Sequence, residues 1–204
     1  MAKKRRPADM REKILAAAES LIVEHGYSGT SLDAVVEKAG CSKSAVYDFF
    51  GGKEGLLSAL SVELVGTLSR ELDSLGHSAE SVESALETYA ARAMTLILTE
   101  RHMSTVRSVI SEVWRSPSLG NSYYQLGPKL AQQRLADYLE RQASAGRLAI
   151  SDEPEKAASH FYGLMLWGKW NAMVVGAMEP MSEIEIQREA SSVVTAFMRI
   201  YGPN

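Results

Sequence analysis

The stretch from Thr30 to Lys53, TSLDAVVEKAGCSKSAVYDFFGGK, constrains the fold of this chain more than any other. Its first part repeats apolar residues at helical spacing and ends at Gly40. Glycine readily adopts the left-handed conformation that terminates many helices. Ser42 then offers a side-chain oxygen to the free backbone N–H groups of a second helix. The stretch therefore predicts two short helices joined by a tight turn.

The predicted second helix has two chemically different sides. We expect its inner side to carry Ala45, Val46, Phe49 and Phe50, and its outer side to carry Lys43, Ser44, Tyr47 and Asp48. Two short helices joined by a turn of about three or four residues form a helix-turn-helix motif. The second helix of such a motif enters the major groove of DNA. The pattern thus indicates a DNA-binding unit.

Many further positions agree with a known signature, in and around the segment AGCSKSAVYDFFGGKEGLL. They are Ile14, Ala17, Gly26, Tyr27, Ala39, Gly40, Ser42, Tyr47, Phe50, Lys53, Glu54 and Leu56. With these residues at these spacings, the chain resembles the TetR family of transcriptional regulators (TetR/AcrR-like) from near residue 11 to about residue 57. The resemblance implies a homodimeric repressor that binds a palindromic operator and is released by a small hydrophobic ligand.

The resemblance also implies an all-α fold of about nine helices. Residues 1–52 would form the helix-turn-helix DNA-binding domain, and residues 53–204 a helical ligand-sensing and dimerisation domain. The apolar periodicity agrees with helices only. We expect the helix that begins at Lys53 to end before a polar, glycine-containing break at Leu75–Ser78. One later helix is expected at about 122–143.

The helix predicted from Glu155 to about Gly176 carries apolar residues around nearly its whole circumference. A helix that is apolar on all sides must be buried on more than one side. In a small domain one side can face the core and the other a second subunit. This pattern agrees with the family resemblance, which implies a dimer formed through the two C-terminal helices.

The candidate DNA-binding residues are Thr30, Ser31, Ser42, Lys43, Ser44, Ala45, Tyr47, Asp48 and Lys53. Lys43, Ser44 and Ala45 lie in the first turn of the second helix, where side chains reach base edges. A lysine there can donate to O6 and N7 of a guanine. Tyr47 and Lys53 are similar to family residues that contact phosphates. Ser31 and Ser42 are equally well explained as helix caps.

Some observations count against DNA binding. The formal net charge of the chain is −3, although the first residues, MAKKRR, supply a basic arm that could contact phosphates or simply remain solvated. Asp48 stands where family members have residues compatible with phosphate. It would either accept from a cytosine N4 or pair with a neighbouring cation. The alternative function is a helical ligand-binding or protein-interaction protein with a degenerate helix-turn-helix.

A ligand pocket is expected inside the C-terminal domain because the family resemblance implies one. Its candidate wall residues are aromatic, Met or His: Met94, His102, Met103, Trp114, Tyr123, Tyr124, Phe161, Met165 and Trp167. Such residues at helical spacing are also the ordinary components of a core. Because none is a charged anchor, a small apolar or aromatic effector is favoured.

Other chemistries find little support in the sequence. The four histidines are scattered, and Cys41 is the only cysteine, so we expect no metal site, no disulfide and no cofactor. The chain has no glycine-rich phosphate loop and no nucleophile elbow, so we do not expect an enzyme. The longest apolar run, 161–175, is too short for a membrane span. We therefore expect a cytoplasmic protein that contacts no membrane.

Overall fold

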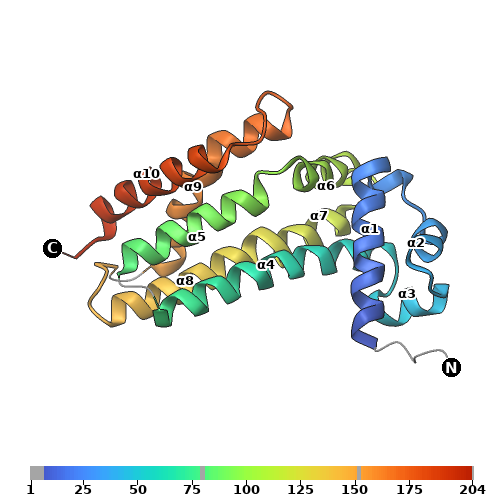
Figure 1. Cartoon of the computed structure of the whole chain (residues 1–204), viewed down its shortest axis with the longest axis horizontal. Helices are drawn as coiled ribbons and strands as arrows, with labels where there is room; N and C mark the ends of the chain where they lie inside the picture. Colours follow the sequence, from blue (N-terminus) through green and yellow to red (C-terminus); the bar gives the residue numbers. More distant parts are fainter. Residues whose placement is uncertain (1–6, 79–80, 151–152, 204) are drawn as a thin grey trace. The chain divides into compact units, whose positions relative to one another are not determined.

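The computed structural model describes residues 7–78, 81–150 and 153–203. Within these ranges the chain is built from helices and contains no strand, which confirms the predicted all-α class (Figure 1). The elements are α1 (Pro7–Gly29), α2 (Leu32–Ala39), α3 (Lys43–Phe50), α4 (Lys53–Ser78), α5 (Val82–Ile97), α6 (Glu100–Glu112), α7 (Pro117–Tyr124), the π-helical segment η1 (Gln125–Lys129), α8 (Leu130–Ser144), α9 (Pro154–Val174) and α10 (Glu183–Tyr201).

The helices group into two compact units. The N-terminal unit comprises the described part of Met1–Glu63 together with Ser104–Gly127, and the C-terminal unit comprises Leu64–Met103 and the described part of Pro128–Asn204. The N-terminal unit therefore holds the first part of α4, most of α6 and all of α7 in addition to α1–α3. The division of function between residues 1–52 and 53–204 stays a prediction.

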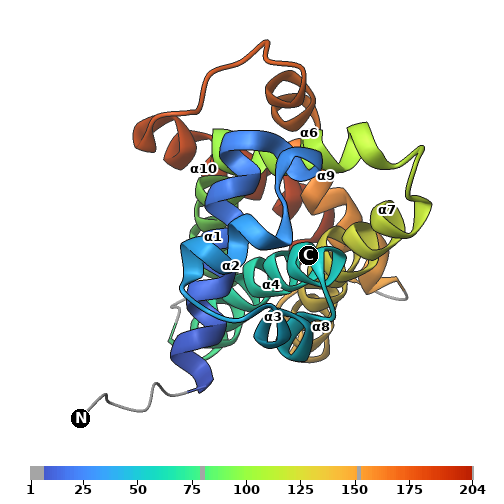
Figure 2. The same cartoon turned by 90° about the vertical axis from the view of Figure 1, so that its right-hand side faces the viewer.

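A small apolar core holds the first helices of the N-terminal unit together. Ile14 and Ala18 of α1, Val35 of α2, Val46 of α3 and Leu56 of α4 are nearly or fully buried in one cluster. The regular part of α1 ends where Gly26 has φ 72° and ψ 170°, outside the helical region. The grouping of α1, α2 and α3 can be followed in Figures 1 and 2. This core fixes the position of α3, which carries the proposed reading surface.

The core of the C-terminal unit is larger and aromatic. The Phe161 ring makes an edge-to-face contact with Phe197 at 5.2 Å between centroids and lies 6.3 Å from Tyr89. The hydroxyl groups of Tyr89 and Tyr162 share a hydrogen bond. Burial raises the pKa of Tyr162 to about 12 and that of Tyr89 well above its ordinary value, so both phenols are neutral at physiological pH. These contacts join α5, α9 and α10 through one buried cluster.

Two of the predicted helix boundaries were wrong. The helix expected at about 122–143 is divided into α7 and α8 by the π-helical segment η1, which contains Pro128. Proline has no N–H to donate, and its ring clashes with the preceding turn, so regular α-helical bonding is interrupted. The break expected at Leu75–Ser78 does not occur, because α4 continues to Ser78. The basic MAKKRR segment lies outside the described residues.

None of the described helices is long and apolar enough to cross a membrane.

Candidate DNA-binding interface

The helix-turn-helix is defined by its caps. The Ser31 hydroxyl accepts a hydrogen bond from the Ala34 N–H at 3.1 Å and begins α2. Gly40 ends α2 in the left-handed conformation at φ 63° and ψ 45°. The Ser42 hydroxyl then accepts from the Ala45 N–H at 3.2 Å and begins α3. The predicted caps at Gly40 and Ser42 are confirmed, and they set the direction in which α3 leaves the turn.

Removing these caps should measurably destabilise the N-terminal unit. We expect Ser31→Ala and Ser42→Ala each to lower the free energy of unfolding by about 1 kcal/mol, since each leaves a helix N–H without its partner. Urea denaturation followed by circular dichroism measures the change. Ser42→Thr keeps a capping oxygen and should stay close to the parent. Alanine variants as stable as the parent would show that the caps contribute nothing.

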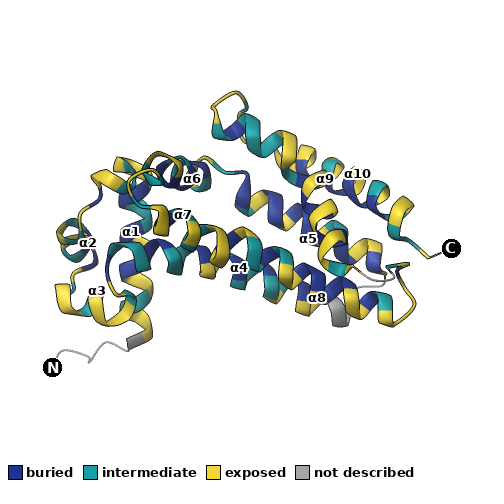
Figure 3. Cartoon of the chain, turned by 180° about the vertical axis from the view of Figure 1, so that it is seen from behind, coloured by how far each residue is buried: buried dark blue, intermediate teal, exposed yellow. Residues whose placement is uncertain are grey.

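The exposed side of α3 is the one predicted from its sequence. Lys43, Ser44 and Asp48 are exposed, and half of the Tyr47 surface is accessible, whereas Val46 is fully buried (Figure 3). The inward placement of Phe49 was wrong, because 39% of its surface is exposed. Val46 is fully buried, and Ala45 and Phe50 are partly buried against the same cluster. Phe49 instead lies against Phe50, with 6.1 Å between the ring centroids.

Lys43 has a partner that the sequence did not suggest. Its Nζ atom lies 2.9 Å from Oδ1 of Asp33 in the first turn of α2, and both side chains are more than half exposed. The hydrogen bond and the charge of Asp33 raise the pKa of Lys43 above its ordinary value. Lys43 is therefore paired with Asp33, and the pairing of Asp48 with a neighbouring cation stays a prediction. The two partners are ten residues apart, on different helices.

The hydroxyl groups of Thr30 and Ser44 differ in how accessible they are for a contact with DNA. Thr30 is buried, and its hydroxyl donates to the Gly26 carbonyl at 2.8 Å, so it serves the turn at the end of α1. Ser44 is exposed and exchanges a hydrogen bond with the Ser42 hydroxyl at 2.9 Å. Ala45 is partly buried. Contact of any of these residues with DNA stays a prediction.

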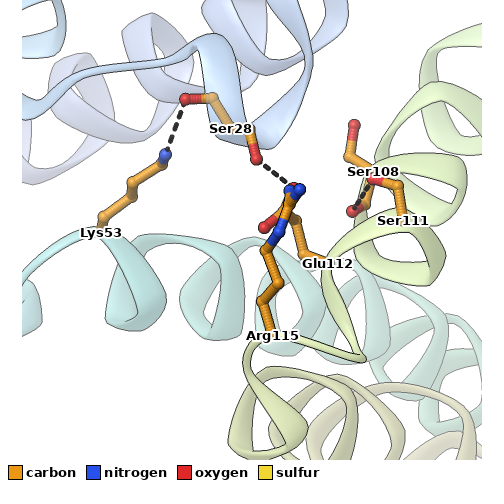
Figure 4. Close-up of polar contacts among 6 residues, drawn as sticks. All are labelled: Ser28, Lys53, Ser108, Ser111, Glu112 and Arg115. Carbon is orange, nitrogen blue, oxygen red and sulfur yellow. Dashed lines mark hydrogen bonds and ion pairs between the residues drawn. The ribbon is translucent and has the colours of Figure 1, made fainter.

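Lys53 lies in a polar cluster at the start of α4 (Figure 4). Its ammonium lies 4.2 Å from the centre of the Tyr27 ring and 3.5 Å from the Ser28 carbonyl oxygen. The Ser28 hydroxyl donates to the carboxylate of Glu112, which also pairs with Arg115 at 3.5 Å. Burial lowers the pKa of Lys53, and the Glu112 charge opposes that shift. The cluster joins α1, α4 and α6 within the N-terminal unit.

Sequence reasoning missed this cluster for a simple reason. Ser28 and Glu112 are 84 residues apart, and no local pattern relates them. The side chain of Glu112 is only 14% exposed, and an acidic residue is rarely buried without partners. Its position at the end of a helix of ordinary amphipathic pattern gave no sign of that burial.

Eight of the nine candidate pocket residues fall into three groups, and the ninth, His102, is partly buried in the C-terminal unit. Met94, Met103, Phe161 and Met165 are fully buried in the core of the C-terminal unit. Trp167 belongs to the same unit but is 75% exposed. Trp114 and Tyr124 are exposed and Tyr123 is partly buried, all in the N-terminal unit. The structure thus brings four of the nine together in one core. Ligand contact by any of them stays a prediction.

His102 is expected to make the stability of the chain depend on pH. The residue keeps some exposed surface, but enclosure of the ring lowers the pKa from 6.5 to about 4. The native state therefore binds fewer protons than the unfolded state between these values. The stabilisation is complete above pH 6.5 and is lost as the pH falls towards 4. Between pH 7 and pH 5 we expect a loss of about 2 kcal/mol in the free energy of unfolding.

Urea denaturation at several pH values measures this effect. His102→Gln carries no titrating ring and should lose correspondingly less stability over the same range. His25→Gln, a change at an exposed histidine, serves as the control and should follow the parent. Equal pH dependence in the parent and in His102→Gln would contradict the assignment.

The capped helices α2 and α3 define a helix-turn-helix, the motif of a class of DNA-binding proteins. Two family models match the chain. Residues 14–60 match the bacterial regulatory proteins of the tetR family, and residues 84–203 match the AefR-like transcriptional repressor C-terminal domain. The chain therefore belongs to the TetR family of transcriptional regulators. The matching families are regulators of transcription and not enzymes.

Individual relatives agree with this assignment. The HTH-type transcriptional regulator YvkB of Bacillus subtilis is 28% identical over 155 residues, which cover 74% of this chain and 76% of YvkB. The regulator Mb1581 of Mycobacterium bovis is 31% identical over 147 residues, which cover 69% of this chain and 68% of Mb1581.

Solved structures agree as well. A protein described as a TetR-family regulator from Mesorhizobium loti superimposes with a TM-score of 0.81 at 28% identity, covering 98% of this chain and all of that one. The Flavonoid-responsive Regulator FrrA superimposes with a TM-score of 0.67 at 28% identity, covering 97% of this chain and 99% of FrrA.

Proposed function

We propose that this protein is a homodimeric repressor that binds a palindromic operator and is released by a small apolar or aromatic ligand. The observation that carries the proposal is the geometry of α3. The helix is capped at its start, anchored by the buried Val46, and exposes Lys43, Ser44 and Tyr47 on one side. Exposed donors in the first turns of a recognition helix are placed to contact base edges and phosphates. Because the partner is operator DNA, the proposed compartment is the cytoplasm.

The proposed dimer forms through α9 and α10. Three large apolar side chains in α9 and at its C-terminal cap are exposed: Leu164 by 40%, Trp167 by 75% and Val175 by 75%. Large apolar side chains that gather on one surface of a soluble chain mark an interaction site. A second copy that presents the same surface would bury these side chains in a symmetric contact.

The proposed ligand is aromatic or apolar. The four buried candidates of the C-terminal unit, Met94, Met103, Phe161 and Met165, provide apolar and polarizable surface without a charged group. The name of FrrA, which is 28% identical to this chain, records a response to flavonoids, which are aromatic small molecules. A ligand releases DNA only if it binds the DNA-incompetent form more tightly than the DNA-bound form.

Selection of bound duplexes from a random pool tests the proposal. We expect recovery of an inverted repeat whose half-site centres are about one turn of DNA apart or a multiple of it, since a two-fold dimer presents two copies of α3. Addition of a flavonoid should then weaken binding to the recovered duplex. A half-site without a repeat would contradict the dimer, and unchanged affinity with the flavonoid would contradict that class of ligand.

The same selection addresses the second candidate function, a helical ligand-binding or protein-interaction protein with a degenerate helix-turn-helix. The exposed carboxylate of Asp48 favours it, because that charge would repel phosphates. If no motif is recovered even at low salt, DNA binding fails and this second candidate is preferred.

A further inference from the structure

The ion pair between Lys43 and Asp33 lies at the point where both helices of the helix-turn-helix begin. Lys43 is the first residue of α3, and Asp33 is in the first turn of α2. The N-terminus of a helix carries partial positive charge, so it stabilises Asp33 and disfavours Lys43. The carboxylate of Asp33, 2.9 Å from the Lys43 ammonium, offsets this unfavourable placement of a cation. The pair therefore favours a position of the Lys43 ammonium beside Asp33.

A lysine without such a partner distinguishes poorly between DNA sequences. Its ammonium is a compact charge on a flexible stem, and phosphates surround any groove it enters. Phosphate contacts strengthen binding to every sequence equally, whereas base contacts carry the sequence information. The partner of Lys43 therefore affects which of these two kinds of contact it makes.

We propose that Asp33 is a positioning residue that directs Lys43 to a guanine edge and away from phosphates. The inference rests on the proposed DNA-binding function. Paired with Asp33, the ammonium keeps two of its three donors free, which matches the two major-groove acceptors of guanine, O6 and N7. The pair carries no net charge, so it gains little from the general field of the phosphates. The carboxylate also repels any phosphate that approaches Lys43.

Four chains and two duplexes test this inference. The chains are the parent, Asp33→Asn, Lys43→Ala and the double variant, and the duplexes are the selected operator and a scrambled duplex of the same length. Asp33→Asn keeps the size of the side chain and removes its charge. Glu37→Gln is the matched control, since it removes the same charge from an exposed position of the same helix. Fluorescence anisotropy over a range of salt concentrations gives each affinity.

We expect Asp33→Asn to bind the scrambled duplex more tightly than the parent. The slope of its log affinity against log salt concentration should be steeper by about 0.9 for each subunit. This change is equivalent to one more phosphate contact. The ratio of operator to scrambled affinity should fall by about tenfold, within the range of one lost base discrimination. In the Lys43→Ala background, Asp33→Asn should change this ratio by less than about twofold, because Lys43 mediates the effect. Glu37→Gln should keep the parent ratio.

Two results would overturn the inference while leaving the proposed function intact. One is specific binding by the parent with an unchanged ratio in Asp33→Asn. The other is an equal effect of Asp33→Asn with and without Lys43, which would make Asp33 a simple source of repulsion. Absence of specific DNA binding by the parent would instead overturn the proposed function, and this inference with it.

Discussion

A double variant with Trp167→Glu and Val175→Glu is expected to be monomeric at concentrations at which the parent is a dimer. Both side chains are 75% exposed in the single chain, so the substitutions leave its core intact. Trp167 follows Leu164 by three residues on the exposed side of α9, and Val175 caps the C-terminal end of the same helix. In the proposed dimer the new carboxylates would be buried without partners, which costs several kcal/mol for each charge.

Loss of the proposed dimer should also weaken operator binding. A monomer contacts one half-site only, and we expect operator affinity to fall by about 100-fold or more, equivalent to about 3 kcal/mol. Sedimentation velocity gives the state of association, and anisotropy gives the affinity. Trp114→Glu makes the same change at an exposed tryptophan outside α9 and α10 and should leave both unchanged. A double variant that remains dimeric would show that the subunits meet elsewhere.

Among the substitutions proposed for this chain, Phe161→Ala is expected to lower the free energy of unfolding the most. The side chain is fully buried, with the rings of Phe197 and Tyr89 at 5.2 and 6.3 Å. Removal of the ring forfeits its burial and leaves a cavity that the neighbouring helices fill only in part. We expect the free energy of unfolding to fall by about 3–5 kcal/mol.

Urea denaturation measures this loss, and two further variants serve as comparisons. Phe161→Leu keeps most of the apolar volume and should cost less than Phe161→Ala, so it remains informative if the alanine variant fails to fold. Trp114→Ala removes a larger aromatic side chain that is 91% exposed and should change stability by less than about 0.5 kcal/mol. Similar losses in Phe161→Ala and Trp114→Ala would contradict the assigned core.

The helix-turn-helix could be predicted from sequence because its determinants are local. A cap needs only a serine and a free N–H three residues later, and a left-handed helix end needs only a glycine. Ser42 and Gly40 therefore appear in the structure as predicted. The family resemblance rested on the same local spacings, and the family comparisons agree with it.

The remaining features depend on contacts between distant residues. Phe49 has the spacing of a buried residue, but 39% of its surface is exposed and its ring lies beside that of Phe50. The pair of Ser28 and Glu112 joins helices that are far apart in sequence. The nine pocket candidates shared composition and spacing, which cannot distinguish buried Phe161 from exposed Trp114. Pro128 interrupts the helix predicted at 122–143 even though the apolar periodicity continues on both sides of it.

The most direct test of DNA recognition by α3 is the duplex selection repeated with Lys43→Ala. If α3 binds in the major groove as proposed, the parent recovers an inverted repeat. The variant should then recover the same repeat with one guanine position relaxed in each half-site, a loss of about 1–3 kcal/mol of discrimination there. A repeat that keeps every position unchanged in Lys43→Ala would show that Lys43 does not contact a base. Failure of the parent to recover any motif at low salt would contradict DNA recognition by this chain.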